Sequence, residues 1–274
     1  MKTKNHFISF VVISLITFVA TFLAITPAQA QFRIGSDGLK FDPTDNKQPV
    51  QASFIVMVKK SKKETELNIG RSNISTIPSY EIGWNVISSP NYGLYAGSGV
   101  GDFFNINEWK STQFTVNLFQ ASAANHSRTL GISAGLGIRA NNYRFASNQS
   151  IERTTGIVMP YEIGRSEKGR LPKKSKFNVA SVHIPVEVFF GNPHKFAFSM
   201  GGYVDMVMNS HTKIKYHGGH KDKVHNFPTN FIQAGAVARL TFHHFSVYAA
   251  YQPTSIFKTT RGPELQQWTI GLAR

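Results

Sequence analysis

Three side chains of this 274-residue sequence have the types needed for hydrolytic chemistry. His183, Glu187 and Asp205 share one parity in two strand-like segments, and Ser181 or Ser199 would lie close to them. A serine nucleophile needs an adjacent base and a carboxylate that orients this base. No Gly-x-Ser-x-Gly elbow stands on a strand-to-helix turn, where such a nucleophile is held in hydrolases. We therefore interpret the group as a structural ion-pair network and assign no catalytic residue.

A second group has side chains that could bind a metal ion. One polar segment carries His211, His217, His220, His225 and Asp222, and imidazole nitrogens at close spacing are ligands for zinc or nickel. A polar loop seldom pre-forms the geometry, so we interpret the segment as a solvated loop whose histidines gain charge at mildly acid pH. The chain has no cysteine, which excludes disulfides, thiolate metal sites and cysteine nucleophiles. The prediction is no metal and no cofactor.

The elements that position these groups are predicted to be strands. Hydrophobic residues make up 41% of the chain and charged ones 16%, and glycine and phenylalanine occur 22 times each, a composition that favours strands and turns. Apolar and polar side chains alternate with a period of two, so each set occupies one face of a strand. The alternation occurs in eight segments: residues 80–86, 113–118, 130–139, 181–190, 196–208, 232–242, 245–251 and 268–272.

Long and short connections alternate between these segments. The connections near residues 124–127, 191–194 and 243–244 are short, whereas those around 147–174 and 217–226 are longer. Outer-membrane barrels have short periplasmic turns and longer extracellular loops in the same alternation. The predicted fold class is all-β: an eight-stranded antiparallel transmembrane β-barrel of the up-and-down type, with a short N-terminal periplasmic extension.

The charges indicate which face of each strand points inward. The centres of the polar faces hold mostly Gly, Ser, Thr, Asn and Gln, where a water-facing surface would carry many Lys and Glu. Alternation alone also fits a soluble, lipocalin-like barrel with its apolar face inside. We expect the apolar face to meet lipid and the polar face to fill a narrow lumen without an open pore. The predicted lumen polar network consists of Glu81, Arg139, His183, Glu187, Asp205 and Arg239.

Aromatic residues cluster near the predicted strand ends, which suits the interfacial girdles of a membrane barrel. Strand-end aromatics also occur in soluble sheets, so this feature adds little by itself. The expected girdle residues are Tyr80, Trp84, Trp109, Tyr143, Phe145, Phe177, Tyr216, Phe231, Phe242, Phe245, Tyr251, Phe257 and Trp268.

The N-terminus has the features of a secretory signal. Lys2 and Lys4 precede a long uncharged apolar run, and Ala28-Gln29-Ala30 offers a cleavage site. The run is also long enough for a retained membrane anchor, but the Ala-x-Ala pattern favours cleavage. We predict a signal peptide over residues 1–30, a periplasmic extension over 31–77 and an outer-membrane barrel over 78–274. The predicted location is the outer membrane, reached by export through the inner membrane.

Thirty basic residues against fifteen acidic ones give a net charge of +15. Nucleic acid is one usual partner of a basic chain, but the export signal argues against it. Basic loops at the outer leaflet would instead meet the phosphates of lipopolysaccharide, through charge-assisted bonds, or simply be solvated. The expected partners are outer-membrane lipid and lipopolysaccharide, with an envelope or secretion protein as a further candidate. The basic residues in question are Arg153, Arg165, Lys168, Arg170, Lys173 and Lys174.

Several segments give the chain a family resemblance. Residues 80–85, 135–145, 210–216 and 257–272 (YEIGWN, GLGIRANNYRF, SHTKIKY and FKTTRGPELQQWTIGL) resemble the PorT-like outer-membrane β-barrel proteins of Bacteroidetes. The resemblance covers residues 78–274 and implies a small outer-membrane barrel, with a role in secretion for a few relatives. Two features depart from it: residues 31–77 match nothing in the family, and the chain ends in Arg274 where barrel-insertion signals usually end in an aromatic residue.

These features predict a structural, binding or secretion-accessory role in the cell envelope, exerted through extracellular loops. The protein is not expected to be an enzyme. The alternative is a lipid-modifying or proteolytic hydrolase that uses lumen or rim residues. A diffusion channel is a third class, but a lumen packed by eight strands should conduct almost nothing.

Overall fold

The computed structural model describes residues 30–35, 38–43, 54–57, 65–70 and 75–274, apart from 126, 147, 167 and 244. Its regular elements are strands and two short 3-10 turns, η1 (Gly93–Tyr95) and η2 (Glu108–Lys110). No helix within these ranges has the length and apolar character needed to span a membrane. Nearly all of the predicted signal peptide lies outside the described residues.

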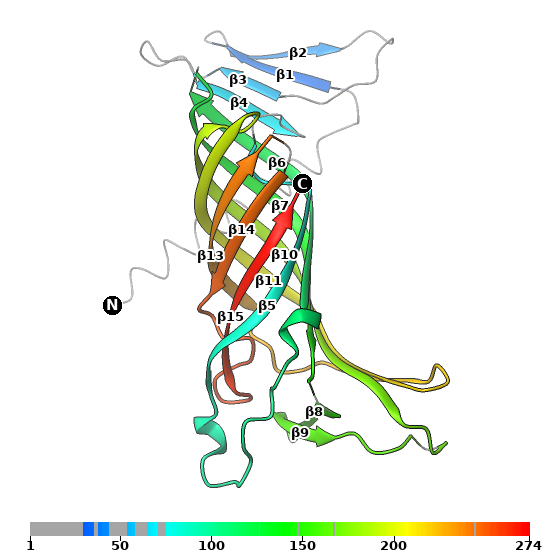
Figure 1. Ribbon diagram of the computed structural model, residues 1–274. Helices are drawn as coiled ribbons and strands as arrows, with labels where there is room; N and C mark the ends of the chain where they lie inside the picture. The colour runs from blue at the N-terminus through cyan, green and yellow to red at the C-terminus, as the bar shows by residue number, and fades with distance from the viewer. Residues whose placement is uncertain are drawn as a thin grey trace.

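Eight strands close into a barrel (Figure 1). Each strand pairs antiparallel with the next one, and β15 returns to pair with β5 from Glu264↔Asn91 to Ala273↔Glu81. All eight predicted segments form barrel strands, so the predicted all-β, eight-stranded antiparallel up-and-down barrel is confirmed. The strands are β5 (Tyr80–Asn91), β6 (Thr112–Asn125), β7 (Leu130–Arg144), β10 (Pro172–Asn192), β11 (Phe196–Tyr216), β13 (Ile232–Phe242), β14 (Phe245–Gln252) and β15 (Glu264–Ala273).

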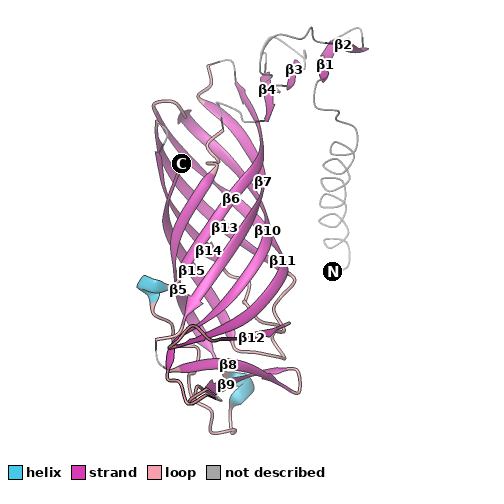
Figure 2. Ribbon diagram, turned by 90° about the vertical axis from the view of Figure 1, so that its right-hand side faces the viewer, coloured by secondary structure: helices cyan, strands magenta, loops and turns pink. Residues whose placement is uncertain are grey.

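The two ends of the barrel differ, as the alternating connection lengths predict. One end, called the short-turn end, carries the β6–β7, β10–β11 and β13–β14 turns together with the first and last barrel residues. There Tyr80 and Arg274 exchange backbone hydrogen bonds of 2.8 Å. The opposite end, called the loop end, carries the long connections, which contain β8 (Gln149–Thr154), β9 (Ile157–Glu162) and β12 (Lys221–His225) (Figure 2).

Four short strands precede the barrel within the predicted extension of residues 31–77 and at its edge: β1 (Ala30–Gly35), β2 (Gly38–Pro43), β3 (Phe54–Met57) and β4 (Thr65–Gly70). Strand β4 pairs with β6 over Gln120–Asn125. The last part of the extension belongs to the barrel end, because Thr76 and Ile77 are almost fully buried there.

The strand faces separate sharply by polarity. Burial alternates along every barrel strand, and β15 is a clear example, with successive residues switching between buried and exposed. The buried positions include many polar and charged residues, whereas the exposed positions in the middle of the barrel wall are apolar. We call the exposed set the apolar belt; all eight strands contribute to it, and its side chains are 36–58% exposed: Ile82, Phe114, Ile132, Ile138, Val186, Val188, Met200, Ile232, Leu240, Val247, Ile270 and Leu272.

Two strands are longer than the barrel requires. Strands β10 and β11 have 21 residues each, and the pairing of β11 with β13 stops at Met206↔Ile232. Beyond that point β11 pairs with β10 on one side and with β12 on the other. The resulting three-stranded sheet sweeps away from the barrel on the loop side (Figure 1).

Candidate functional site

The inward positions of the eight strands bring the predicted polar network into the centre of the barrel. Eight strands leave an interior that side chains fill, so inward residues from different strands must contact one another. All six predicted residues lie inside, and none is more than 3% exposed. Together they form what we call the charged network: Glu81, Arg139, His183, Glu187, Asp205 and Arg239.

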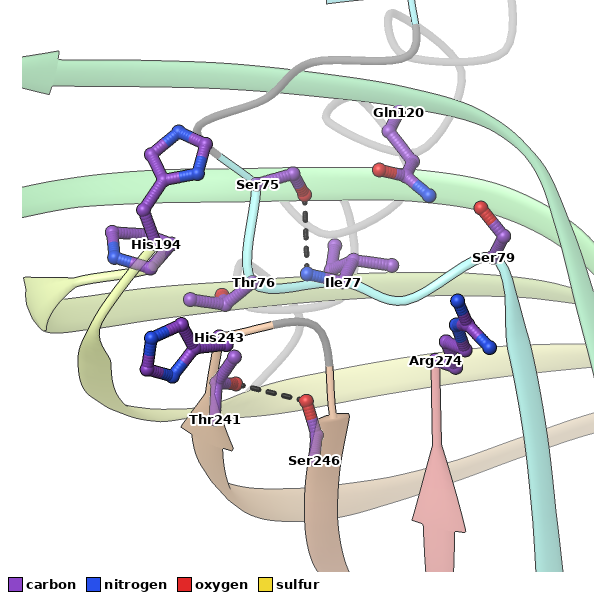
Figure 3. Close-up of a pocket in the computed structure, with 11 residues that line it drawn as sticks. Ser75, Thr76, Ile77, Ser79, Gln120, His194, Thr241, His243, Ser246 and Arg274 are labelled. Atoms are coloured by element: carbon purple, nitrogen blue, oxygen red, sulfur yellow. Dashed lines mark hydrogen bonds between the residues drawn. The ribbon is translucent and has the colours of Figure 1, made fainter.

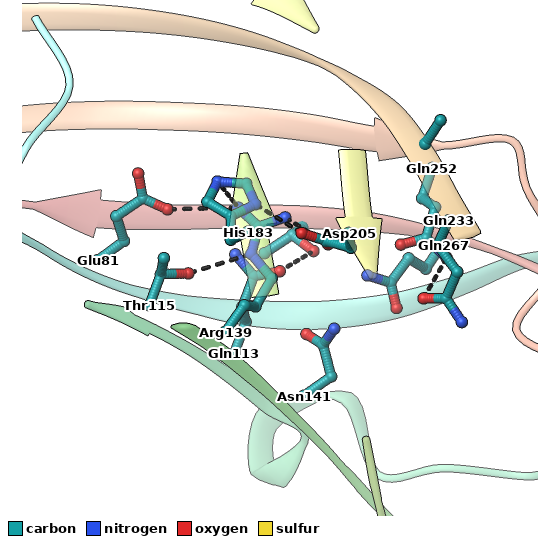
Figure 4. Close-up of polar contacts among 12 residues, drawn as sticks. Glu81, Gln113, Thr115, Arg139, Asn141, His183, Asp205, Gln233, Gln252 and Gln267 are labelled. Carbon is teal, nitrogen blue, oxygen red and sulfur yellow. Dashed lines mark hydrogen bonds and ion pairs between the residues drawn. The ribbon is translucent and has the colours of Figure 1, made fainter. Parts of the chain in front are cut away.

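Arg139 organises one half of this network (Figure 4). Its Nη1 donates to Asp205 Oδ2 at 3.0 Å, its Nη2 lies 2.8 Å from His183 Nε2, and its Nε donates to the Thr115 hydroxyl at 3.1 Å. The other imidazole nitrogen, His183 Nδ1, lies 2.6 Å from Asp205 Oδ1. Because His183 and Asp205 are cross-strand partners on β10 and β11, strand register alone places this pair.

Arg239 organises the other half. Its Nη2 donates to Glu81 Oε1 at 2.8 Å and to Glu187 Oε1 at 3.1 Å. Glu81 also lies 3.5 Å from Arg139, so one continuous set of contacts connects both halves. Buried charges are tolerated when they are paired and hydrogen-bonded. Each carboxylate and each arginine of the network has an ion-pair partner, although Glu81 Oε2 and Arg239 Nη1 form no hydrogen bond.

Two tyrosines complete the network, and the sequence patterns did not single them out. The Arg139 guanidinium lies 4.5 Å from the centre of the Tyr203 ring, and the Arg239 guanidinium lies 5.1 Å from that of Tyr248. Glycines opposite these rings make the space: a Cβ at Gly235 would lie 2.5 Å from the Tyr203 hydroxyl. A tyrosine at an inward position facing a glycine on a neighbouring strand is the sequence signal that could have found them.

The geometry does not assemble a serine–histidine–acid triad. Ser199 donates to Glu187 at 2.6 Å, and both imidazole nitrogens of His183 are engaged by Arg139 and Asp205. Among the described residues, no serine hydroxyl is hydrogen-bonded to His183. The residues proposed for a hydrolase are therefore held in the charged network, with the histidine 1% exposed.

An aromatic cluster closes the loop end of the lumen and corrects part of the predicted girdle. Phe104, from the first long connection, packs edge-on against Tyr143, Phe145, Phe177 and Phe257, with ring centroids 5.3–6.1 Å apart. The prediction that these strand-end aromatics face lipid was wrong for five residues, which are buried: Tyr143, Phe145, Phe177, Tyr216 and Phe257. We call Phe104 and its four partners the aromatic cap.

The strand face on which each aromatic residue lies explains why some are buried and others exposed. Tyr143 and Phe177 are cross-strand partners on inward positions of β7 and β10, so they continue the lumen rather than the outer surface. Outward aromatics remain at both ends of the apolar belt. The ring centroids of Phe196 and Phe242 lie 5.0 Å apart at the short-turn end. Towards the loop end, Tyr251 stacks on Trp268 with ring centroids 4.5 Å apart.

The short-turn end of the lumen is closed by the segment that enters the barrel. Pro78 accepts a hydrogen bond from Asn117 Nδ2 at 2.8 Å, and Ile77 is only 2% exposed. Beside this segment lies a polar hollow of about 200 Å³, whose lining includes His194, His243 and Arg274 (Figure 3). Together with the aromatic cap, this segment closes the described lumen at both ends.

The interpretation of the histidine-rich segment as a loop was wrong in part, because His211 lies in β11 and Asp222 and His225 lie in β12. Four of the five candidate metal ligands form two separate pairs, and His217 belongs to neither. His211 and His225 stack with ring centroids 5.2 Å apart, whereas His220 Nε2 lies 2.8 Å from Asp222 Oδ1. In the part of the chain that the structure describes, no three His, Cys, Asp or Glu side chains gather into a metal-binding group.

The stacked histidine pair predicts a pH response outside the barrel. The pKa of His211 is lowered, first by burial and then by the positive charges of His225 and Lys223. Protonation therefore favours the unfolded segment, so the stability of the β11–β12 pairing is highest above about pH 6.5 and falls as the pH decreases below it. We expect faster amide exchange in β11–β12 at about pH 5 than at about pH 7, after correction for intrinsic rates. His211→Gln should weaken this pH dependence, and an unchanged dependence would contradict the assignment.

The predicted basic loop residues divide between two environments. Arg153 donates to the backbone carbonyl of Asn226 at 2.9 Å, and Arg170 to that of Gly218 at 3.2 Å, so both arginines connect two long loops. The prediction that Lys173 and Lys174 lie in a loop was wrong, because both belong to β10, on the sheet that extends past the barrel. A comparison of the sequence with protein-family models and with curated proteins found no match.

Proposed function

We propose that this chain is an outer-membrane β-barrel protein with a binding or structural role in the cell envelope. The observation that carries the proposal is the polarity of the closed barrel, with charges inside and an apolar belt outside. In water, a dozen large apolar side chains around the whole circumference would form an exposed surface far larger than soluble monomers carry. In a bilayer the same belt contacts acyl chains, and barrel closure satisfies the backbone groups.

A soluble, lipocalin-like barrel would require the opposite arrangement. Its lumen would be apolar and its outer face polar. The charged network, with Arg139 and Arg239 at most 3% exposed, argues against that alternative. The export signal predicted from the sequence supports the same location.

The loops are the part of the molecule that we propose acts on partners. They carry most of the irregular structure at one end, they include Trp109 with 84% of its surface exposed, and they are rich in basic residues. Lipopolysaccharide and an envelope or secretion protein are the proposed partners. Membership of the PorT-like family, and with it a secretion-accessory role, remains a proposal that rests on the sequence segments quoted above.

Membrane fractionation with heat-dependent gel mobility tests this proposal. A folded outer-membrane barrel resists the detergent of the gel until it is heated and migrates differently before and after boiling. We expect the chain in the outer-membrane fraction, with a mobility shift on heating. Recovery as a soluble periplasmic protein without such a shift would overturn the proposal.

The closed lumen predicts that the barrel does not act as a diffusion channel. Ile77 obstructs the short-turn end, the charged network fills the centre, and the aromatic cap covers the loop end. We expect planar bilayers containing the purified protein to show no stepwise conductance above the lipid background. A stable unitary conductance would contradict this prediction and would favour the channel alternative.

A further inference from the structure

The sheet that extends past the barrel carries an unusual concentration of positive charge on its outer face. Its side chains lie at outward positions of neighbouring strands, in two rows that run across the sheet. We call this set the basic grid: Arg144 on β7, Lys174 and Lys176 on β10, Lys213 and Lys215 on β11, and Lys221 and Lys223 on β12.

Strand register places these charges directly opposite one another. Lys176 pairs with Lys213, which in turn pairs with Lys223, and Arg144 extends this row on β7. The second row consists of Lys174, Lys215 and Lys221. Neighbouring strands lie about 4.8 Å apart, and like charges opposite one another destabilise a sheet. An anion held between them would remove that repulsion.

Protein carboxylates do not supply this anion. Among the described residues, no Asp or Glu forms an ion pair with any member of the basic grid. The nearest acid along the chain, Asp222, is the cross-strand partner of the buried Ile214 and therefore lies on the opposite face. It is paired there with His220. The grid thus presents its charges outward without an internal counter-ion.

The shape and electrostatics of the grid suit an anionic group. Five of its lysines surround a hollow of about 190 Å³, which has room for a phosphate group. The pKa values of Lys176 and Lys213 are lowered, first by burial and then by the surrounding lysines and, for Lys176, Arg144. A bound phosphate would offset this mutual repulsion through charge-assisted hydrogen bonds.

The outer face changes in regular steps from the apolar belt to the grid. The row of Ile138, Val182 and Met206 is apolar, the row of Ala140, Ala180 and Asn209 is small and partly polar, and the next row is polar. That polar row consists of Asn142, Asn178, His211 and His225, and the lysine rows follow it.

This order matches the order of groups met on leaving a bilayer. Four strand residues separate Ala180 from Lys176, which is about 10 Å along the membrane normal for a strand tilted by about 40°. With Ala180 at the edge of the hydrocarbon core, the backbone of the first lysine row lies just beyond the head-group layer, which is about 5–7 Å thick, and the flexible lysine side chains can reach back to it. Because the grid shares its face with the apolar belt, a molecule seated on both must combine acyl chains with phosphates.

We propose that the basic grid binds the phosphate groups of the phosphorylated glycolipid of the outer leaflet, lipopolysaccharide. The inference rests on the proposed outer-membrane location and deepens it, because it names the lipid, the face and the residues. The acyl chains lie along the apolar belt of β10 and β11, and the glucosamine phosphates reach the lysine rows above them.

Native mass spectrometry of the full chain, refolded in non-ionic detergent, tests this assignment by titration with bisphosphorylated lipid A. The test variant combines Lys176→Gln, Lys213→Gln and Lys215→Gln. The control combines Lys110→Gln, Lys195→Gln and Lys258→Gln, three exposed lysines outside the grid, so both variants lose the same charge. Dephosphorylated lipid A and inorganic pyrophosphate are the two comparison ligands.

We expect the grid variant to bind bisphosphorylated lipid A roughly 10- to 100-fold more weakly than wild type, because each lysine near a lipid surface contributes to attraction. The control should change by less than about twofold, since isolated exposed charges contribute little. The affinity of the wild type for dephosphorylated lipid A should be as low as the affinity of the grid variant for bisphosphorylated lipid A. Equal affinity of wild type and grid variant for lipid A would overturn the inference, and so would binding of free pyrophosphate as tight as that of lipid A.

The heat-dependent mobility of the same samples separates this inference from the proposed function. Wild type and both variants should shift on heating, because the grid lies outside the barrel wall that the shift reports. If the wild type shifts on heating but does not prefer phosphorylated over dephosphorylated lipid A, the lipid assignment is overturned and the proposed function is not. A wild-type protein that neither shifts nor fractionates with the outer membrane overturns the proposed function and the lipid assignment with it.

Discussion

Replacing Arg239 with methionine is expected to lower the unfolding free energy of the barrel by about 3–5 kcal/mol, because it leaves Glu187 buried without a cation and leaves Glu81 with only its 3.5 Å contact to Arg139. Methionine retains much of the volume and flexibility of the arginine side chain, so a cavity contributes little to the loss. Urea unfolding of the protein refolded into phospholipid vesicles measures the change. The heat-dependent gel shift should move to lower temperature in parallel.

A combined variant distinguishes lost charge pairing from lost packing. Adding Glu81→Gln and Glu187→Gln to Arg239→Met removes the unpaired charges as well, and replacing a whole buried ion pair is much less harmful than breaking it. We expect the triple variant to regain more than half of the lost stability. A single variant that loses less than about 1 kcal/mol would show that the network does not stabilise the barrel as its geometry indicates.

Placing an arginine in the middle of the apolar belt is the second change with a large expected effect. Val186 faces outward on β10, four residues from the short-turn aromatic Phe190, and is 38% exposed. In a bilayer, Val186→Arg should cost about 2–4 kcal/mol, since a charge at the midplane of a barrel's lipid-facing wall is destabilising by this amount. In water, the same exposed position would accept arginine with little change. Unfolding in vesicles measures the difference.

Leu94→Arg is the matched control for this experiment. Leu94 lies in η1 at the loop end and is 43% exposed, so it resembles Val186 in apolar character and exposure but lies beyond the belt. We expect its unfolding free energy to stay within about 0.5 kcal/mol of wild type. Equal effects of Val186→Arg and Leu94→Arg would contradict a lipid-facing belt and would favour the soluble barrel.

The strand pattern was accessible from the sequence because a strand repeats every two residues and a barrel has only two faces. Ile132 and Ser133, for example, must point to opposite sides wherever the strand lies. The polar parity therefore identified all six members of the charged network before any contact was known. Charge balance alone also indicated that these residues pair, because unpaired charges are too costly in a narrow lumen.

Which charged side chains form ion pairs in the lumen depends on the strand register and the shear of the closed barrel. Parity places Arg239 inside, but it does not say that Glu81, which is 158 positions away, is the carboxylate it binds. The same limit explains the error at Tyr143 and Phe177. Their place at strand ends suggested that they face the lipid interface. Both rings instead occupy inward positions and are buried in the lumen beneath the loops.

By itself, the sequence of this protein determined the number of strands, their two faces and the alternation of short turns and long loops, since all three depend on local periodicity. Only the tertiary structure decided which charges meet, that aromatic rings and Ile77 close the two ends of the lumen, and that seven basic residues from four strands form one grid. Those features arise from pairings between residues far apart in the chain, and strand register, which no local pattern contains, sets each of them.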